Sequence, residues 1–322
     1  LRRGVAAAVI AGIVVSSGIP AYAIQWNIAE GDITVKAGDE GTNKVTQGGT
    51  IEQEDRDTVI TGKSDKNTVT IDTSKGDVDV TFDDLKIDVS GRDEGNAAVR
   101  VEGGGDVTIE LDGKNELKSG GFNAGLEKDG HRSEGTLTIK DDKGKDGSLT
   151  AEGGGEGGAG IGGRVESTGS NITIRGGTVE AVGGAGAAGI GGGVYGTGHD
   201  IEISGGKVSA TGGDAGDDLG EDRTGAAGIG DGAGTEGREI DPDAPPSNPD
   251  NPNHIIISGD AEVEAKAGAS NGGGTAAIGG TYGEVPTEAL SDDDHKVTGG
   301  RLTRLNADGT EMEGMGYDYT ST

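Results

Sequence analysis

Residues 171–193 read NITIRGGTVEAVGGAGAAGIGGG, and residues 200–232 repeat them as DIEISGGKVSATGGDAGDDLGEDRTGAAGIGDG. Self-similarity of this kind is the signature of a repeat architecture, in which each unit packs against its neighbours. Two aliphatic pairs recur 29 residues on, and a third recurs 39 residues on because about ten residues are inserted around 217–223. The matches are Ile172/Ile174 with Ile201/Ile203, Val179/Ala181 with Val208/Ala210, and Ala188/Ile190 with Ala227/Ile229.

The same three-part unit extends along most of the chain. Its further members are Val78/Val80, Val107/Ile109, Leu137/Ile139 and Ile255/Ile257 for the first part, Leu149/Ala151 and Val263/Ala265 for the second, and Ala97/Val99, Ala124/Leu126, Ala159/Ile161 and Ala276/Ile278 for the third. Residues two apart on a strand point the same way, so each pair should face the interior. Three short strands per unit of roughly 29 residues predict an all-β chain with one parallel β-helix of about seven to eight coils, stacked about 4.8 Å apart.

Glycine accounts for 68 of the 322 residues, and the GAAGIGGG stretch at 186–193 carries no acid, base or nucleophile. We expect Ala188 and Ile190 to face the interior, Gly189 and Gly191 to face outward, and flanking glycines to supply positive φ angles at corners. A phosphate loop would need Gly-Lys-Ser/Thr before a helix, and collagen would need glycine at every third position. Neither pattern is present, so the stretch is interpreted as one wall of a coil and its turn.

The repeat NITIRGGTVEAVGGAGAAGIGGG resembles those of bacterial cell-surface β-helix proteins that bind carbohydrate. The resemblance covers roughly Val59 to Leu305 and rests on the repeated A-x-I-G-G pattern. It implies a right-handed, pectate-lyase-like β-helix and binding of acidic or plant cell-wall polysaccharide, with calcium in some members. No site motif of the family can be transferred residue by residue.

The ends and insertions of the chain suggest its organisation. Two arginines, an apolar run and Ala21-Tyr22-Ala23 make residues 1–23 a predicted signal peptide, although a membrane anchor is the alternative. The mature protein is then expected to be secreted or at the cell surface. The remaining predicted segments are a lead-in and cap at 24–57, the β-helix at 58–305, excursions near 214–224, 234–253 and 282–295, and a tail at 306–322.

The charge balance limits the partners. The chain carries a net charge of −30, and removing residues 1–23, which hold two basic residues and no acidic ones, makes it −32. Such a protein is not expected to bind nucleic acid or an anionic membrane unaided. An acidic polysaccharide would also be repelled, so its binding would need a bridging cation or a local basic strip. The sequence does not determine the oligomeric state.

Candidate calcium ligands come from an acidic insertion and the wall next to it. The predicted set is Asp217, Asp218, Asp222 and Asp231. Calcium takes six to eight oxygen ligands, often carboxylates and loop carbonyls, so an inserted loop on a rigid coil suits it. The alternative is that acidic loops simply keep the protein soluble.

Candidate sugar-binding residues are few, because aromatic residues make up only 2% of the chain. Tyr195 and Tyr282 follow the third strand at corresponding corners and could stack on sugars, although either could simply cover a turn. Arg164, Arg175 and Lys207 lie at or near corners of successive coils and could form the basic strip.

No residue pattern predicts a catalytic site. With 57 acidic residues some carboxylate pair will always lie close, and the four histidines do not form metal-ligand spacing. The favoured hypothesis is a noncatalytic polysaccharide-binding protein. One alternative is a polysaccharide lyase or hydrolase, which only analogy with enzymes of this fold supports. The other is a structural adhesin or stalk that binds protein.

Overall fold

The computed structural model describes residues 24–39, 41–49, 52–91, 95–143, 146–216, 225–234, 254–270, 275–279, 295–312 and 317–319. This part of the chain is all-β: apart from the 3-10 helix η1 (Ile28–Glu30), its regular elements are strands of one long, mostly parallel sheet. None of its helices has the length and apolar character needed to cross a membrane. The predicted signal peptide at 1–23 lies outside the described residues.

The strands fall into three rows, and within a row each strand pairs in parallel with the next. Row 1 consists of β1 (Gln25–Asn27), β5 (Val59–Ser64), β7 (Val78–Asp88), β9 (Val107–Asp112), β12 (Leu137–Lys140), β15 (Gly169–Ile174), β18 (Gly198–Ile203), β21 (Ile255–Ile257) and β24 (His295–Val297). We call the stretch of chain from one strand of a row to the next a coil.

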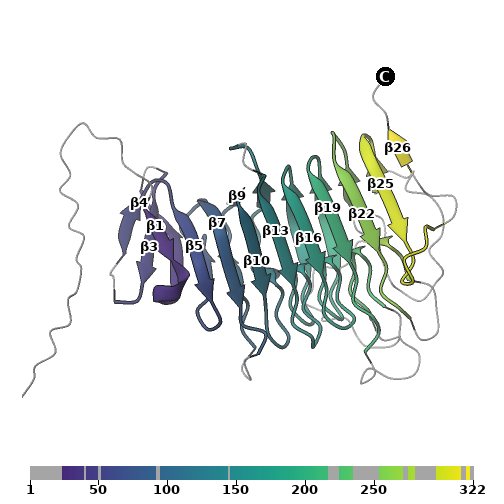
Figure 1. Cartoon of the computed structure of the whole chain (residues 1–322), viewed down its shortest axis with the longest axis horizontal. Coiled ribbons are helices and arrows are strands. Elements are labelled where there is room, and N and C mark those ends of the chain that lie inside the picture. The colour runs from purple at the N-terminus through teal and green to yellow at the C-terminus, as the bar shows by residue number, and fades with distance from the viewer. Residues whose placement is uncertain are drawn as a thin grey trace, which may run out of the picture.

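Rows 2 and 3 are built in the same way. Row 2 starts with the ends of β5 and β7 and continues through β10 (Lys114–Lys118), β13 (Ser148–Glu152), β16 (Thr178–Val182), β19 (Lys207–Thr211), β22 (Glu262–Lys266) and β25 (Gly300–Leu305). Row 3 consists of β2 (Ile33–Ala37), β6 (Val69–Asp72), β8 (Val99–Gly103), β11 (Leu126–Ser133), β14 (Ile161–Gly162), β17 (Ile190–Gly191), β20 (Ile229–Gly230) and β23 (Ile278–Gly279). Figure 1 shows row 2 running along the long axis.

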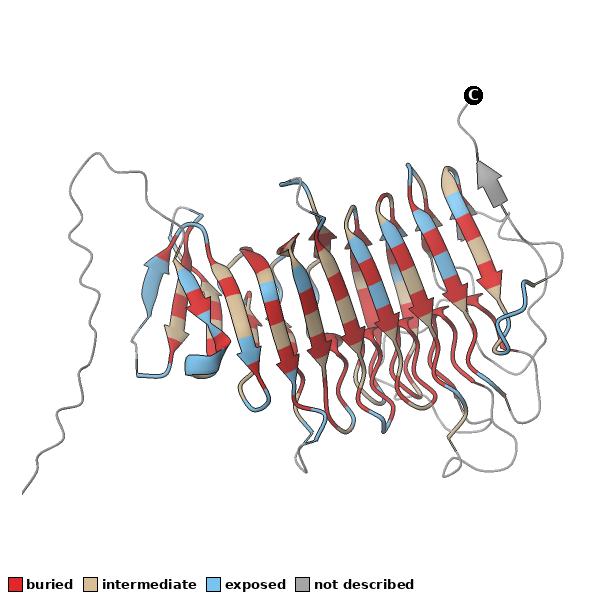
Figure 2. Cartoon of the chain, in the orientation of Figure 1, coloured by how far each residue is buried: buried red, intermediate tan, exposed pale blue. Residues whose placement is uncertain are grey.

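The aliphatic ladders predicted from the repeat are confirmed in register. Ile172 pairs with Ile201 in row 1, Val179 with Val208 in row 2, and Ile190 with Ile229 in row 3. All of these side chains are buried and belong to one continuous core. Buried and exposed positions alternate along the row 2 strands (Figure 2), as expected for strands with one face on the core.

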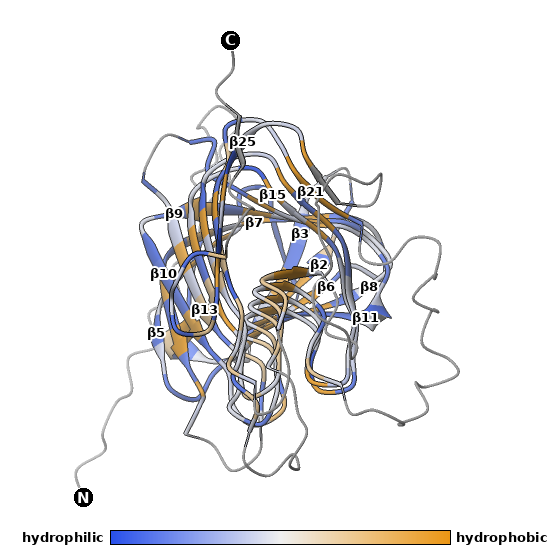
Figure 3. Ribbon diagram, turned by 90° about the vertical axis from the view of Figure 1, so that its right-hand side faces the viewer, coloured by the Kyte–Doolittle hydropathy of each residue, from blue (hydrophilic) through white to orange (hydrophobic). Residues whose placement is uncertain are grey.

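Gly189 and Gly191, which were expected to face outward, are both buried. A Cβ atom on Gly189 would lie 2.6 Å from the amide nitrogen of Thr211 in row 2, and one on Gly191 would overlap the carbonyl of Gly230 in the next coil. In the later coils the outer side of row 3 is therefore covered by backbone of row 2 and of the next coil; Figure 3 views the stacked rows along the long axis. Backbone packs on backbone there because glycine leaves no side chain between them.

The two ends of the stack differ from its middle. β1 and β2 lie within the segment predicted to be a lead-in, and they already pair in parallel with β5 and β6. β3 (Asn43–Gln47) and β4 (Gln53–Asp55) add antiparallel strands beside β2. The indole nitrogen of Trp26 donates to Asp55 Oδ2 at 2.8 Å, which ties this end together. At the other end β26 (Tyr317–Tyr319) pairs antiparallel with β25.

Candidate functional site

The residues predicted to bind carbohydrate are divided between two corners. Arg175 is exposed in the turn after β15, and Lys207 begins β19 on the next coil, so both lie where row 1 passes into row 2. Arg164 and Tyr195 lie instead in turns after row 3, in β14–β15 and β17–β18 respectively. The structure therefore does not bring Arg164, Arg175 and Lys207 into one strip.

The backbone of Tyr195 helps to hold two neighbouring coils together. Its φ of +65° is left-handed, and its amide donates to the carbonyl of Ala233 on the next coil at 2.8 Å. Glu166, one coil earlier, has a φ of +62° and donates in the same way to Val194. The side chain of Tyr195 is only half-buried, so its ring can still meet a ligand. Tyr282 lies outside the described residues.

The predicted calcium set is described only at Asp231. Its side chain is buried, and Oδ1 accepts a hydrogen bond from the amide of Gly198 at 2.8 Å. Asp231 thus holds the turn that leads into β18. Asp217, Asp218 and Asp222 lie outside the described residues, and within the described ranges no three His, Cys, Asp or Glu side chains gather as a metal site.

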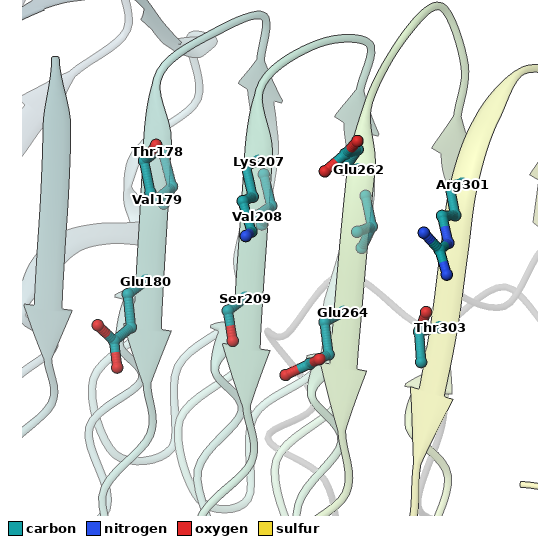
Figure 4. A pocket seen from close by; sticks show the side chains of 11 residues that line it. Thr178, Val179, Glu180, Lys207, Val208, Ser209, Glu262, Glu264, Arg301 and Thr303 are labelled. Carbon is teal, nitrogen blue, oxygen red and sulfur yellow. The ribbon is translucent and has the colours of Figure 1, made fainter. Parts of the chain in front are cut away.

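A shallow groove of about 520 Å³ crosses the outer face of row 2 in the later coils. Four consecutive strands, β16, β19, β22 and β25, supply its floor and its polar side chains (Figure 4). The outward side chains that line it are Thr178, Glu180, Lys207, Ser209, Glu262, Glu264, Arg301 and Thr303. Of the predicted sugar-binding residues that the structure describes, Lys207 alone lines this groove.

The parallel register places the groove residues in two ladders. The first ladder is Thr178, Lys207, Glu262 and Arg301, and the second is Glu180, Ser209, Glu264 and Thr303. The side chains of Val179, Val208 and Val263, which alternate with them, point into the core and are buried. Because the core fixes these strands, the groove presents its charges from a rigid floor.

Two pairs of oppositely charged side chains join neighbouring strands in the early coils of row 2. Lys86 contacts Glu116 at 2.6 Å and Lys118 contacts Glu152 at 2.7 Å, each pair joining directly opposite residues on neighbouring strands. These hydrogen bonds lower the pKa of Glu116 and raise that of Lys118. Both pairs are partly exposed, so each is expected to contribute little to stability.

Lys207, Glu262 and Arg301 occupy directly opposite positions of the same kind in the later coils, yet they are not paired. None of the three forms an ion pair within 4.0 Å with any residue of the described part of the chain. In Figure 4 the side chains of Lys207 and Glu262 extend in different directions along the wall. Their charged groups are therefore free to meet a ligand.

Sequence reasoning missed most of this groove. It followed the inward pairs of the repeat, which recur, and not the residues between them, which change from coil to coil. Those intervening positions in TVEAV, KVSAT, EVEAK and GRLTRL contain Glu180, Lys207, Glu262, Glu264 and Arg301. A 29-residue offset aligns only the first two of these strands, and the strand pairing is what aligns all four into two polar ladders.

A second unusual set of charges lies in row 3, on β11. Glu127, Lys128 and Asp129 are all buried, and Lys128 is fully so. Burial lowers the pKa of Lys128 to about 8, while Asp129 and Asp106 oppose that shift. Its Nζ donates to the carbonyl of Ser133 at 2.6 Å and closes the bulge of this strand. This amine is enclosed and has a structural role.

No protein-family model, curated protein or solved structure matches the chain. Functional argument therefore rests on the repeat, the fold and the groove.

Proposed function

We propose that the chain is an exported, noncatalytic polysaccharide-binding protein and that the row 2 groove is its binding surface. The observation that carries this proposal is the open groove across four strands, in which all outward side chains are polar or charged. Polysaccharides display hydroxyl groups along an extended chain, and such ligands need donors and acceptors spread over a length of surface. A flat wall of a repeat protein offers that length.

The groove favours binding over catalysis. Glu180, Glu262 and Glu264 are exposed on an open wall. Glycoside hydrolysis relies on two carboxylates set on opposite sides of one bond, and active sites commonly close around the substrate to exclude water. The groove floor is a single face, so its carboxylates all approach a ligand from the same side.

The proposal includes the architecture and location of the protein. A right-handed parallel β-helix of seven to eight coils accounts for the three rows and for the 29-residue register that links Ile172 to Ile201 and Val179 to Val208. The basic and apolar start of the chain supports export and a secreted or surface location. Shared fold would not by itself support any ligand.

A tryptophan in the groove tests the site. Ser209 lies on the second ladder in the centre of the groove, and Ser209→Trp would fill the space above the floor. Thr138→Trp is the matched control, because Thr138 is an outward residue of β12 in row 1. Binding to a panel of pectin, cellulose and other glycans should fall at least tenfold in Ser209→Trp and be unchanged in Thr138→Trp. If the wild type binds no glycan in the panel, with or without calcium, the proposed function is wrong.

Calcium is the second part of the proposal. A chain of such negative charge repels a purely anionic polymer within the screening distance of about 8 Å at physiological salt, so a bridging cation would be required. Binding to polygalacturonate should fall sharply in EDTA and in a variant with Asp217, Asp218 and Asp222 changed to alanine. Neutral glucans should respond to neither change. Polygalacturonate binding that survives both changes but disappears in Arg175→Ala would favour a basic strip instead.

A further inference from the structure

The first ladder of the groove alternates in sign from strand to strand. Lys207 on β19 is followed by Glu262 on β22 and Arg301 on β25, in direct parallel register. Neighbouring strands lie about 4.8 Å apart, so the Cα atoms of Lys207 and Arg301 are roughly 10 Å apart and that of Glu262 lies between them. Glu180 and Glu264 on the second ladder add negative charge beside this row.

The absence of pairing is informative because the same wall can pair its charges. Lys86 with Glu116 and Lys118 with Glu152 join across neighbouring strands at 2.6 and 2.7 Å. Lys207, Glu262 and Arg301 have the same cross-strand relation and carry opposite charges, but they form no such contact within the described ranges. The three unpaired charges all line the row 2 groove, whereas Lys86, Glu116 and Glu152 do not.

Three classes of polymer fit this pattern poorly. A polyanion would meet Glu180, Glu262 and Glu264 as well as the strongly negative chain. A polycation would be attracted to the chain as a whole but would have to cross Lys207 and Arg301. A neutral glycan would remove water from five charged groups without offering any of them an opposite charge.

We infer that the groove binds a zwitterionic polysaccharide, one whose chain carries both carboxylate or phosphate groups and free amino groups. Anionic groups of the polymer meet Lys207 and Arg301, and its ammonium groups meet Glu262, Glu264 on the same strand and Glu180 two strands away. This inference rests on the proposed function and specifies the ligand class of the same groove. Recognition comes from the order of the charges, since opposite charges must coincide along the polymer and like charges in the wrong register repel.

Four polymers of matched length test the inference: carboxymethyl chitosan, which carries both charges, chitosan, polygalacturonate and dextran. Titration calorimetry would be run in EDTA so that calcium bridging plays no part. We expect carboxymethyl chitosan to bind at least tenfold more tightly than any of the other three. Raising the salt concentration should weaken it, because the contacts are between exposed charges.

Single charge removals locate the effect. Lys207→Gln, Glu262→Gln and Arg301→Gln should each weaken the binding of carboxymethyl chitosan about fivefold or more. Lys118→Gln is the matched control, because Lys118 is on the same wall but outside the groove and already pairs with Glu152. It removes the same positive charge from the whole protein as Lys207→Gln and Arg301→Gln do, and should leave affinity unchanged.

The outcomes separate the two proposals. If chitosan binds as tightly as carboxymethyl chitosan and all four glutamine variants behave alike, attraction to the whole negative chain explains binding and the inference is overturned. If dextran binds and Ser209→Trp abolishes that binding while the charge removals do not, the groove is a glycan site and only the ligand class is wrong. If none of these polymers and no glycan of the wider panel binds, both proposals fail.

Discussion

One ladder of row 3 divides the molecule into two halves. In direct register it runs through Thr34, Thr70, Arg100 and Glu127 in the early coils and then through Gly162, Gly191, Gly230 and Gly279 in the later ones. The early row 3 strands are four to eight residues long, and the later ones have two residues. The same position is therefore filled by side chains in one half and by bare backbone in the other.

The two halves stabilise the same position by different means. Arg100 Nε contacts the buried Glu127 carboxylate at 2.7 Å, and Arg100 also reaches Asn123 Oδ1 at 3.3 Å. In the later half Gly162, Gly191 and Gly230 have φ values of +134°, +134° and +130°, which side chains rarely adopt. The early half thus depends on a charge pair, whereas the later half depends on shape, and the two should respond differently to substitution.

A valine at Gly191 should have the largest effect. Its Cβ would overlap the carbonyl of Gly230, which belongs to the backbone and has little room to move, and its φ would be strained as well. We expect a loss of more than about 5 kcal/mol, enough to abolish folding. Thr70→Val, at the same ladder position in the early half, should stay within about 0.5 kcal/mol of the wild type. Urea denaturation followed by circular dichroism measures both, and equal losses would remove the distinction between the halves.

An aspartate at a core-facing position of row 3 should destabilise both halves equally. Ile190 and Val99 occupy the same inward ladder, and both are fully buried. Ile190→Asp and Val99→Asp should each cost about 5 kcal/mol, because a buried carboxyl group has no partner there even when it protonates. Thermal melting monitors the change. An unaltered melting temperature for Ile190→Asp would mean that this residue does not face the core.

Removing the arginine of the early half should be costly for a different reason. Arg100→Met leaves the buried Glu127 carboxylate without its charge partner, and we expect a loss of about 4 kcal/mol. Adding Glu127→Met should recover part of that loss, because it removes the stranded charge. A double-mutant cycle measures the coupling between the two residues. Additive losses would show that the pair does not stabilise this position.

The smallest expected effect is a pH dependence at Lys128. Burial lowers its pKa from 10.5 to about 8, so between these values the unfolded chain binds more protons than the folded one. The free energy of unfolding should therefore rise with pH over this range, by up to about 3 kcal/mol. Below pH 8 the cost of burying the charged Lys128 amine is fully present. Lys128→Met should remove this contribution, and the difference between the unfolding free energies of the two proteins isolates it. A difference that stays constant from pH 7 to 10.5 would contradict the lowered pKa.

The sequence predicted the repeated core positions but not the outward positions, whose residues change from coil to coil. Ile172, Val179 and Ile190 could be placed on their ladders because an aliphatic alternation at a fixed offset has one consistent register. The burial of Gly189 and Gly191 was not foreseen, because a glycine carries no side chain that shows what covers it. The groove was missed because the residue type at this ladder position changes from coil to coil. Only the strand pairing shows that Lys207, Glu262 and Arg301 lie opposite one another.

Lys128 was hidden from sequence reasoning for a further reason. Lysine is almost always exposed, and the register shift between Lys128 and Ser133 that encloses it has no marker in the residues themselves. The candidate calcium residues remain a prediction from composition, apart from Asp231, whose hydrogen bond to Gly198 became visible only when the two coils were stacked.

The 29-residue register of β15 with β18 and of β16 with β19 has a consequence for how such a protein can change over generations. Recombination between in-frame repeats of a gene would add or delete one whole coil at each exchange. Since a coil contacts only its immediate neighbours, the remaining coils would keep their contacts. Each event would lengthen or shorten the wall by one strand, about 4.8 Å, and so alter the length of the wall without a change of fold.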